Sequence, residues 1–112
     1  MIKVLIVEPG KMPYTKEING TLESMQEVVG GYIQAIYPFE DYVALVCNEE
    51  GKINDLPINR YLLNAEYGIY DCICGTFFVC SCPPDNQHFS SLSENDIKKY
   101  SELMESRIIT TM

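Results

Sequence analysis

The stretch from Val28 to Arg60, VVGGYIQAIYPFEDYVALVCNEEGKINDLPINR, decides the fold of this 112-residue chain. It contains two apolar runs, at positions 32–37 and 42–47, that are rich in aromatic and β-branched residues. Such residues are enriched in strands. Only Pro-Phe-Glu-Asp separates the two runs, and connections this short join antiparallel strands. The stretch therefore predicts a β-hairpin near the middle of the chain.

One helix is predicted before this hairpin and one well after it. The first begins at Thr21, whose hydroxyl can accept a hydrogen bond from a first-turn amide. It ends at Gly30-Gly31, because glycine adopts the left-handed conformation without a Cβ penalty. The second begins at Ser93, with Asp96 three residues later in a capping-box-like position.

The remaining apolar runs predict further strands. Ile2–Val7 is suited to a strand buried on both faces, and Tyr14–Ile18 to its antiparallel partner. We expect Tyr70–Cys82 to form one long strand with Gly75 as a bulge, and Leu56–Leu63 to hold a short helical turn. The predicted fold is a single α+β domain over residues 1–112. It comprises a mainly antiparallel sheet of about five strands with two helices packed on it.

Charge and composition exclude several classes of protein. The formal net charge is −8, from 16 acidic and 8 basic side chains, so the basic footprint of a direct nucleic-acid binder is lacking. No run of 18 apolar residues is present, which argues against a membrane span. The opening MIKVLIVEPG is typical of a first strand and not of a signal peptide. Together with five cysteines, this predicts a cytoplasmic protein with free thiols.

Two Cys-x-Cys pairs, Cys72/Cys74 and Cys80/Cys82, raise the question of a zinc site. In an unbroken strand all four side chains line one face. The outer pair would then lie roughly 33 Å apart, at about 3.3 Å per residue. A tetrahedral zinc ion needs its sulfurs at about 2.3 Å from the metal. We therefore expect neither a metal nor another cofactor.

Residues for catalysis are sparse. Nucleophilic catalysis needs a Ser, Thr or Cys beside a base, and the single histidine, His88, lies in a polar loop. The carboxylate pairs Glu40-Asp41 and Glu49-Glu50 are adjacent residues, which point to opposite faces of a strand. We predict that the protein is not an enzyme and assign no catalytic residue.

The chain resembles a family of small phage, prophage and mobile-element proteins that is catalogued as a domain of unknown function. The resemblance covers most of the chain. It is carried by the Leu22/Met25 spacing, Val29–Gln34, Asn48–Lys52 and Leu56–Arg60, with support from Ile2–Pro9 and Gly75–Val79.

The resemblance implies a genetic context among counter-defence accessory genes. Small phage proteins of this kind include sponges, which bind a host immune signalling nucleotide and withhold it from its effector. We therefore expect a cytoplasmic, non-catalytic protein in the host cell that sequesters a nucleotide-like ligand, in a pocket built from the central motif across a homodimer. The alternative is an acidic protein-interaction module that inhibits a host defence protein.

The central motif offers groups suited to such a ligand. Arg60 suits a phosphate or carboxylate, Asn59 and Gln34 suit a base edge, and the tyrosines suit stacking. A structural reading stays open, in which these residues fix turns and Arg60 braces the fold. The candidate ligand-binding residues are Tyr32, Gln34, Tyr37, Asn48, Glu49, Glu50, Asn59 and Arg60.

Overall fold

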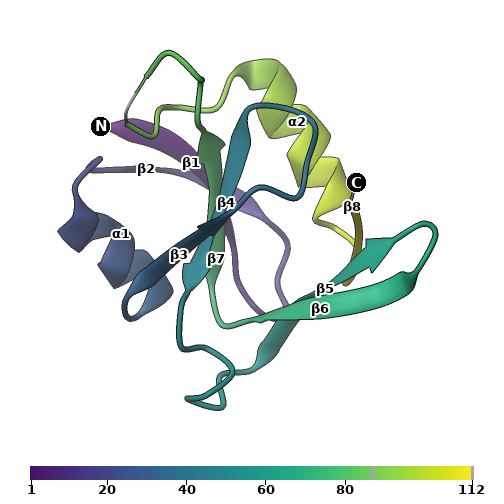
Figure 1. The fold of residues 1–112 in the computed structure, drawn as a ribbon. Helices are drawn as coiled ribbons and strands as arrows, with labels where there is room; N and C mark the ends of the chain where they lie inside the picture. The colour runs from purple at the N-terminus through teal and green to yellow at the C-terminus, as the bar shows by residue number, and fades with distance from the viewer. Residues whose placement is uncertain (87, 112) are drawn as a thin grey trace.

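A computed structural model describes residues 1–86 and 88–111 as two packed sheets with two helices (Figure 1). The strands are β1 (Ile2–Val7), β2 (Tyr14–Ile18), β3 (Ile33–Ile36), β4 (Val43–Asn48), β5 (Ile58–Asn64), β6 (Gly68–Cys74), β7 (Phe77–Ser81) and β8 (Ile108–Thr111). The helices are α1 (Leu22–Val29) and α2 (Glu94–Leu103). The predicted α+β class is confirmed.

Sheet A is five-stranded and antiparallel, in the order β2-β1-β7-β4-β3. It contains the predicted hairpin, in which Gln34 pairs with Cys47. Sheet B has the order β6-β5-β8, with β8 parallel to β5. The second sheet and the parallel strand were not predicted. The predicted number of about five strands therefore matches sheet A alone.

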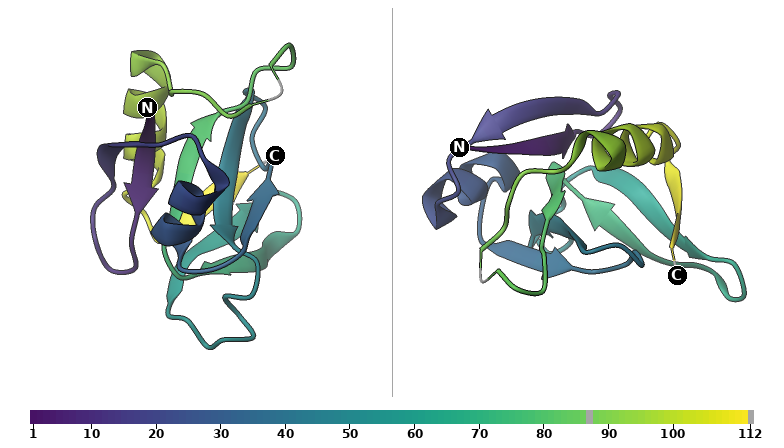
Figure 2. Two further views of the ribbon diagram at one scale, coloured as in Figure 1. Left: turned by 90° about the vertical axis from the view of Figure 1, so that its left-hand side faces the viewer. Right: turned by 90° about the horizontal axis from the view of Figure 1, so that it is seen from above.

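Alternation along the central strands divides the interior into two cores. Leu45 of β4 and Val79 of β7 face sheet B and α2, where they pack with Leu62 and Ile109. Their neighbours, such as Val46, face α1 on the other side of sheet A. Because strand side chains alternate between faces, a strand buried on both sides becomes continuously apolar. β4 is buried at every position for this reason. In the right-hand view of Figure 2, α1 lies on the left, apart from β5 and β6 of sheet B on the right.

Both helices begin where the sequence predicts. The Thr21 hydroxyl accepts a hydrogen bond from Ser24 N at 3.2 Å, and the Ser93 hydroxyl accepts one from Asp96 N at 3.1 Å. Helix α1 ends at Gly30, whose φ of 80° is left-handed. Among the described residues, no helix is long and apolar enough to cross a membrane.

Two local predictions were wrong. Tyr70–Cys82 is not one strand, because Gly75, with φ 85°, ends β6 and turns the chain from sheet B into β7 of sheet A. Its N–H donates to the Pro57 carbonyl at 2.8 Å, which fixes the corner. Leu56–Leu63 holds no helical turn, since Ile58–Asn64 is strand β5. Pairing with β6 and β8 on either side overrides the helix start suggested by Pro57.

Helix α2 is tied to the β3–β4 connection by Asp41. The Asp41 carboxylate accepts hydrogen bonds from Lys99 Nζ at 2.6 Å and from Tyr100 Oη at 2.7 Å. The buried Tyr100 ring also packs against Phe39, with ring centroids 4.9 Å apart. The hydrogen bond from Lys99, and then that from Tyr100, lowers the pKa of Asp41 below its ordinary value.

We expect Asp41→Asn to lower the melting temperature at pH 7 and to have less effect at pH 3. A lowered carboxyl pKa stabilises the fold above the unfolded-state pKa, and this stabilisation is lost as the pH falls through the folded-state pKa, below about pH 4. Thermal melts of wild type and variant between pH 3 and 7 measure the difference. Asp85→Asn, on an exposed loop, is the matched control. If the difference in melting temperature between wild type and Asp41→Asn stayed constant with pH, the stabilising role of the Asp41 carboxylate would be contradicted.

Candidate functional site

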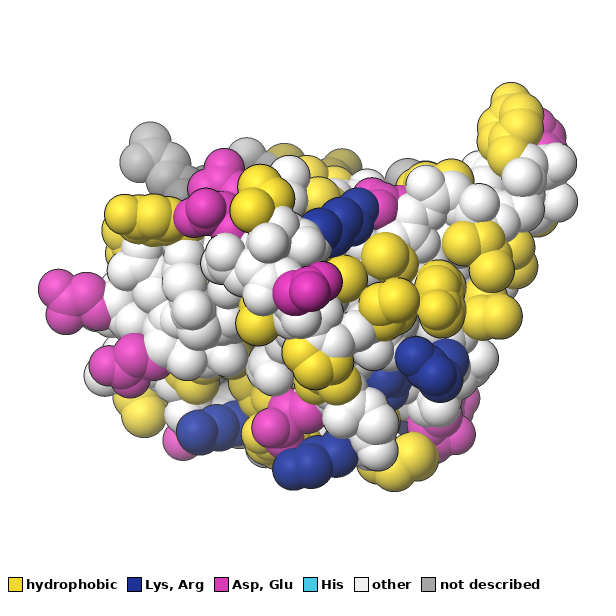
Figure 3. Space-filling view, turned by 90° about the horizontal axis from the view of Figure 1, so that it is seen from below, with side chains coloured by type: hydrophobic (Ala, Val, Ile, Leu, Met, Phe, Trp, Pro, Cys, Tyr) yellow, Lys and Arg dark blue, Asp and Glu magenta, His cyan; other side chains and the backbone are white. Residues whose placement is uncertain are grey.

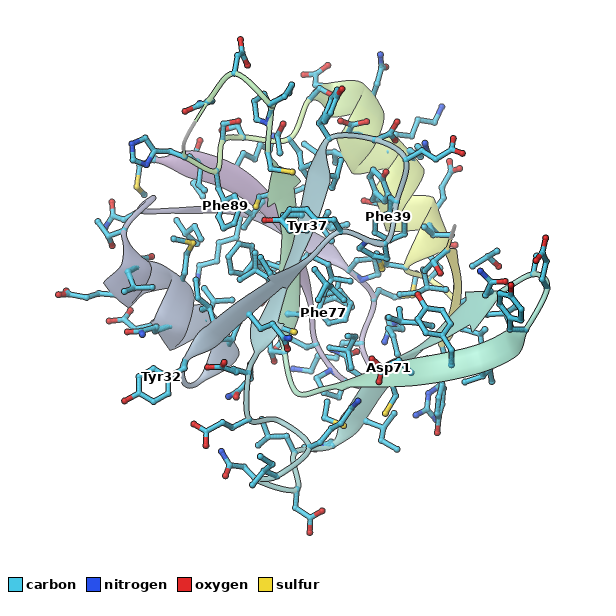
Figure 4. The ribbon with its side chains drawn as sticks, viewed as in Figure 1. Tyr32, Tyr37, Phe39, Asp71, Phe77 and Phe89 are labelled. Atoms are coloured by element: carbon cyan, nitrogen blue, oxygen red, sulfur yellow. The ribbon has the colours of Figure 1, made fainter. Side chains whose placement is uncertain are left out.

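A cleft of about 320 Å³ opens between the two sheets, where β3 and β4 of sheet A approach β6 of sheet B. The turn at residues 51–53 closes one end of it. Asp71, labelled in Figure 4, lies on β6 at this junction. The lining residues are Gln34, Ile36, Cys47, Asn48, Glu49, Gly51, Lys52, Ile53, Asp71, Cys72, Ile73 and Cys74.

The cleft has an apolar interior and a polar rim. Ile73 and Cys47 are buried, and Ile36 packs against the same core. Gln34 and Glu49 of the sheet A wall are exposed, as are Lys52 and Asp71 on the opposite side. An apolar pocket with a few convergent polar groups is typical of small-molecule sites.

Lys52 and Asp71 form an ion pair at the rim of the cleft. The hydrogen bond to Asp71 raises the pKa of Lys52. Burial alone would raise the pKa of Asp71, but hydrogen bonds from Lys52 and from Cys72 N bring it below its ordinary value. The Cys72 N–H donates to Asp71 Oδ1 at 2.8 Å. The pair therefore covers part of the β6 edge, and a charged edge discourages unwanted strand pairing.

Three thiols line the cleft: Cys47, Cys72 and Cys74. Burial raises the pKa of the Cys47 thiol. Burial, followed by a hydrogen bond with Cys72, raises the pKa of Cys74. Thiolate is the nucleophilic form, so these shifts keep both groups unreactive near neutral pH.

The two Cys-x-Cys pairs do not line one strand face, as the sequence predicted, but lie on different sheets. The turn at Gly75 puts Cys72 and Cys74 on sheet B and Cys80 at the centre of sheet A. Burial raises the pKa of Cys80 to about 12. Within residues 1–86 and 88–111, no group of three or more His, Cys, Asp or Glu side chains could hold a metal ion.

Asn48 is a structural residue in the wall of the cleft. Its Nδ2 donates to the Val29 carbonyl at 3.1 Å, and its Oδ1 accepts from Glu50 N at 2.8 Å. A Cβ on Gly31 would lie 2.9 Å from Asn48 Nδ2, so Gly31 permits this close approach. The Asn48 side chain thereby joins the end of α1 to the turn after β4.

Asn59 and Arg60 brace the interior. Arg60 is 3% exposed, and its Nε and Nη2 donate to the Met104 carbonyl at 3.0 and 2.7 Å. Its other bonds reach the Lys11 carbonyl at 3.1 Å and the carbonyl and Oδ1 of Asn59 at 3.0 and 2.8 Å. Asn59 Nδ2 in turn donates to the carbonyls of Val7 and Gly75. The guanidinium thus caps the C-terminal end of α2, where the helix dipole favours a cation.

The structure separates the eight predicted site residues into four places. Gln34, Asn48 and Glu49 line the cleft. Tyr32 and Glu50 line a second hollow of about 230 Å³ on the other side of Asn48.

Figure 4 shows Tyr32 and Tyr37 at opposite ends of β3, so the two rings cannot stack on one base. Asn59 and Arg60 lie in the interior. Their engaged donors favour the structural brace that the sequence left open.

Comparison with known proteins identifies a family. A family model described as Domain of unknown function (DUF3846) matches residues 2–105. The chain belongs to the DUF3846 family. No curated protein and no solved structure shows a significant match to it.

Three side chains that line the cleft of this DUF3846 domain were not predicted from the sequence: Cys47, Lys52 and Asp71. Lys52 is part of the central motif, but its partner Asp71 lies beyond it in the chain and pairs only after β6 folds back. Cys47 lies in the apolar run at positions 42–47 and was not among the predicted site residues. Its position at the end of a wholly buried run predicts an inward side chain, and this signal could have placed it in the cleft.

Proposed function

We propose that this DUF3846 domain is a non-catalytic binder of a small, nucleoside-like molecule, with the cleft between the sheets as its site. The observation that carries the proposal is one cleft that combines a buried apolar interior with Gln34 and Glu49 on one wall and the Lys52–Asp71 pair on the other. A volume of about 320 Å³ lies at the small end of the roughly 300–1,000 Å³ of ligand pockets. A ligand of nucleoside size suits it better than a dinucleotide.

The charged side chains of the cleft are better suited to contacting the base and sugar of a nucleotide-like ligand than its phosphate. Arg60 is committed to carbonyl oxygens, which leaves Lys52 as the cation in the cleft, and Lys52 is paired with Asp71. Glu49 and Asp71 accept hydrogen bonds, as sugar hydroxyls and amino groups require. Gln34 both donates and accepts, which suits a base edge.

Two features support binding without turnover. The thiols of Cys47 and Cys74 have raised pKa values, so each is a poor nucleophile. The glutamine and the carboxylates of the rim are suited to holding a polar ligand by hydrogen bonds.

The specific biological role that we propose is sequestration of a host signalling nucleotide in the host cytoplasm. The resemblance to small phage and mobile-element proteins supports this role. A sponge has to bind its ligand tightly and does not have to catalyse a reaction, and a preformed cleft meets that requirement.

The test is a thermal-shift and calorimetric panel of nucleosides, mononucleotides and ADP-ribose derivatives. A ligand present at 100 times its Kd should stabilise the fold by about 2.7 kcal/mol. Gln34→Ala should weaken binding of that ligand roughly tenfold while the melting temperature of the free protein stays unchanged, since Gln34 is exposed. Chromatography after incubation should recover the ligand intact.

Gln26→Ala is the matched control, because Gln26 lines the second hollow and not the cleft. If Gln26→Ala weakens binding and Gln34→Ala does not, the assignment of the cleft is wrong. If no compound of the panel binds and the protein captures another protein from host lysate, the chain is better explained as an acidic protein-interaction module.

A further inference from the structure

The outer face of sheet B carries an apolar patch. One side of this sheet packs into the core through Leu62 and Ile109, while the other side faces outward. Tyr67 is 80% exposed, Ile69 53% and Ile108 43%. Figure 3 shows hydrophobic side chains gathered on the right of the view, over sheet B, with the β5–β6 hairpin projecting beyond them. The outer-face patch comprises Ile58, Tyr61, Leu63, Tyr67, Ile69 and Ile108.

Strand register makes this patch continuous. Tyr61 of β5 pairs with Ile108 of β8, so these two side chains lie side by side on one face. Two residues further along β5, Leu63 pairs with Ile69 on the same face. The patch therefore runs across all three strands.

The two ends of the patch carry opposite charges. At one end the Arg107 guanidinium lies over the Tyr61 ring, 5.8 Å from its centroid. At the other end Glu66 lies beside Tyr67 in the exposed turn of the β5–β6 hairpin. Glu66 follows Tyr61 by five positions, the last two of them in the turn beyond β5, so the two residues lie at most roughly 16 Å apart at about 3.3 Å per residue.

We propose that a second copy of this chain covers the outer-face patch, with sheet B packed on sheet B about a twofold axis and the hairpin tips pointing in opposite directions. In a twofold interface the same surface meets itself, so each group on one copy needs its complement on that same patch. A patch with a cation at one end and a carboxylate at the other meets this requirement. Arg107 of each copy then lies opposite Glu66 of the other, and the Tyr67 ring packs on the partner's end of the patch.

The patch is large enough for the centre of such an interface but not for the whole of it. A fully buried aromatic side chain covers about 150–250 Å², and two of the six side chains of the patch are tyrosines. A standard interface buries about 800 Å² per partner, so the surface around the patch would have to contribute as well. The proposal does not rest on the ligand-binding function, because its residues lie outside the cleft.

Sedimentation equilibrium of the full chain tests the proposal. Wild type is expected to have the mass of two chains at about 100 µM, and the double variant Ile69→Asp/Ile108→Asp to have the mass of one. Both variant positions are exposed, so circular dichroism and the melting temperature should stay close to wild type. A wild-type chain that stays monomeric at this concentration overturns the proposal, even if another protein binds the patch.

Charge reversal tests the arrangement without relying on apolar substitutions. Glu66→Lys and Arg107→Glu should each weaken dimerisation about tenfold, and the double reversal should restore it to within about threefold of wild type. The matched control is Lys16→Glu/Glu17→Lys on β2, at the far edge of sheet A, which should leave dimerisation unchanged. Failure of the double reversal to restore assembly, or sensitivity to the control pair, shows that a different surface is used and overturns the proposal.

Discussion

Arg60→Ala is expected to lower the free energy of unfolding by about 3–5 kcal/mol, which is the largest single effect we predict outside the apolar core. The variant removes donors from the carbonyls of Met104, Lys11 and Asn59, and Asn59 Oδ1 loses its partner as well. Buried acceptors without donors cost about 1–3 kcal/mol each. A domain of this size has only about 5–15 kcal/mol of stability, so much of the fold would be lost.

Urea denaturation followed by circular dichroism measures this loss. Arg107→Ala is the matched control, because Arg107 is exposed and its side chain rests on the Tyr61 ring. We expect the control to cost about 1 kcal/mol or less when both proteins are measured at a dilution at which the chain is monomeric. An Arg60→Ala protein with wild-type stability would show that the buried network is not a brace, and Arg60 would return to the set of candidate ligand contacts.

Gly75→Ala is expected to destabilise the fold by about 2–5 kcal/mol, combining backbone strain with a steric clash. The φ of 85° is left-handed, which costs a residue with a Cβ about 1–2 kcal/mol. The new Cβ would also lie 2.7 Å from Leu56 Cδ1, so the Leu56 side chain must move. Overpacking of this kind costs about 1–3 kcal/mol.

Gly10→Ala separates the two contributions. Gly10 has a similar φ of 72°, but an added Cβ there meets nothing within 4 Å. The destabilisation caused by Gly10→Ala should therefore come from backbone strain alone. In the double variant Gly75→Ala/Leu56→Ala the clash is absent, and the double-mutant cycle should show a favourable coupling. Equal costs at Gly75 and Gly10 would mean that Leu56 moves aside freely.

Local signals in the sequence predicted much of sheet A and both helix starts. Thr21 and Ser93 carry their signal within three residues, and the hairpin at positions 32–47 needs only a short connection. Sheet B was missed because its evidence is not local. The pairing of Ile108 with Tyr61 joins distant segments, and no periodicity specifies a partner. The turn at Gly75 depends on a positive φ, which a glycine permits but does not require.

The candidate site was predicted only in part for a related reason. The motif around Asn48 and Arg60 is rich in polar groups, and polar groups serve turns and buried networks as readily as ligands. Arg60 was read as an anion contact, yet the acceptors that engage it are backbone carbonyls of Lys11 and Met104. Every residue has a backbone carbonyl, so the amino-acid sequence does not show which carbonyls will accept hydrogen bonds from Arg60.

The central position of β7 has a consequence for synthesis on the ribosome. β7 pairs with β1 through Val79 and Leu5, and with β4 through Val79 and Leu45, so it joins two hairpins that are made before it. At about 5–20 residues per second, roughly 2–6 s pass between completion of β4 and the emergence of β7. During that interval β1 and β4 each have one edge without a partner strand. Almost all of their residues are buried in the folded protein, so these exposed apolar edges are prone to aggregation. The yield of folded protein should therefore depend on chaperones that shield the nascent chain, and more strongly when translation is slowed between residues 49 and 77.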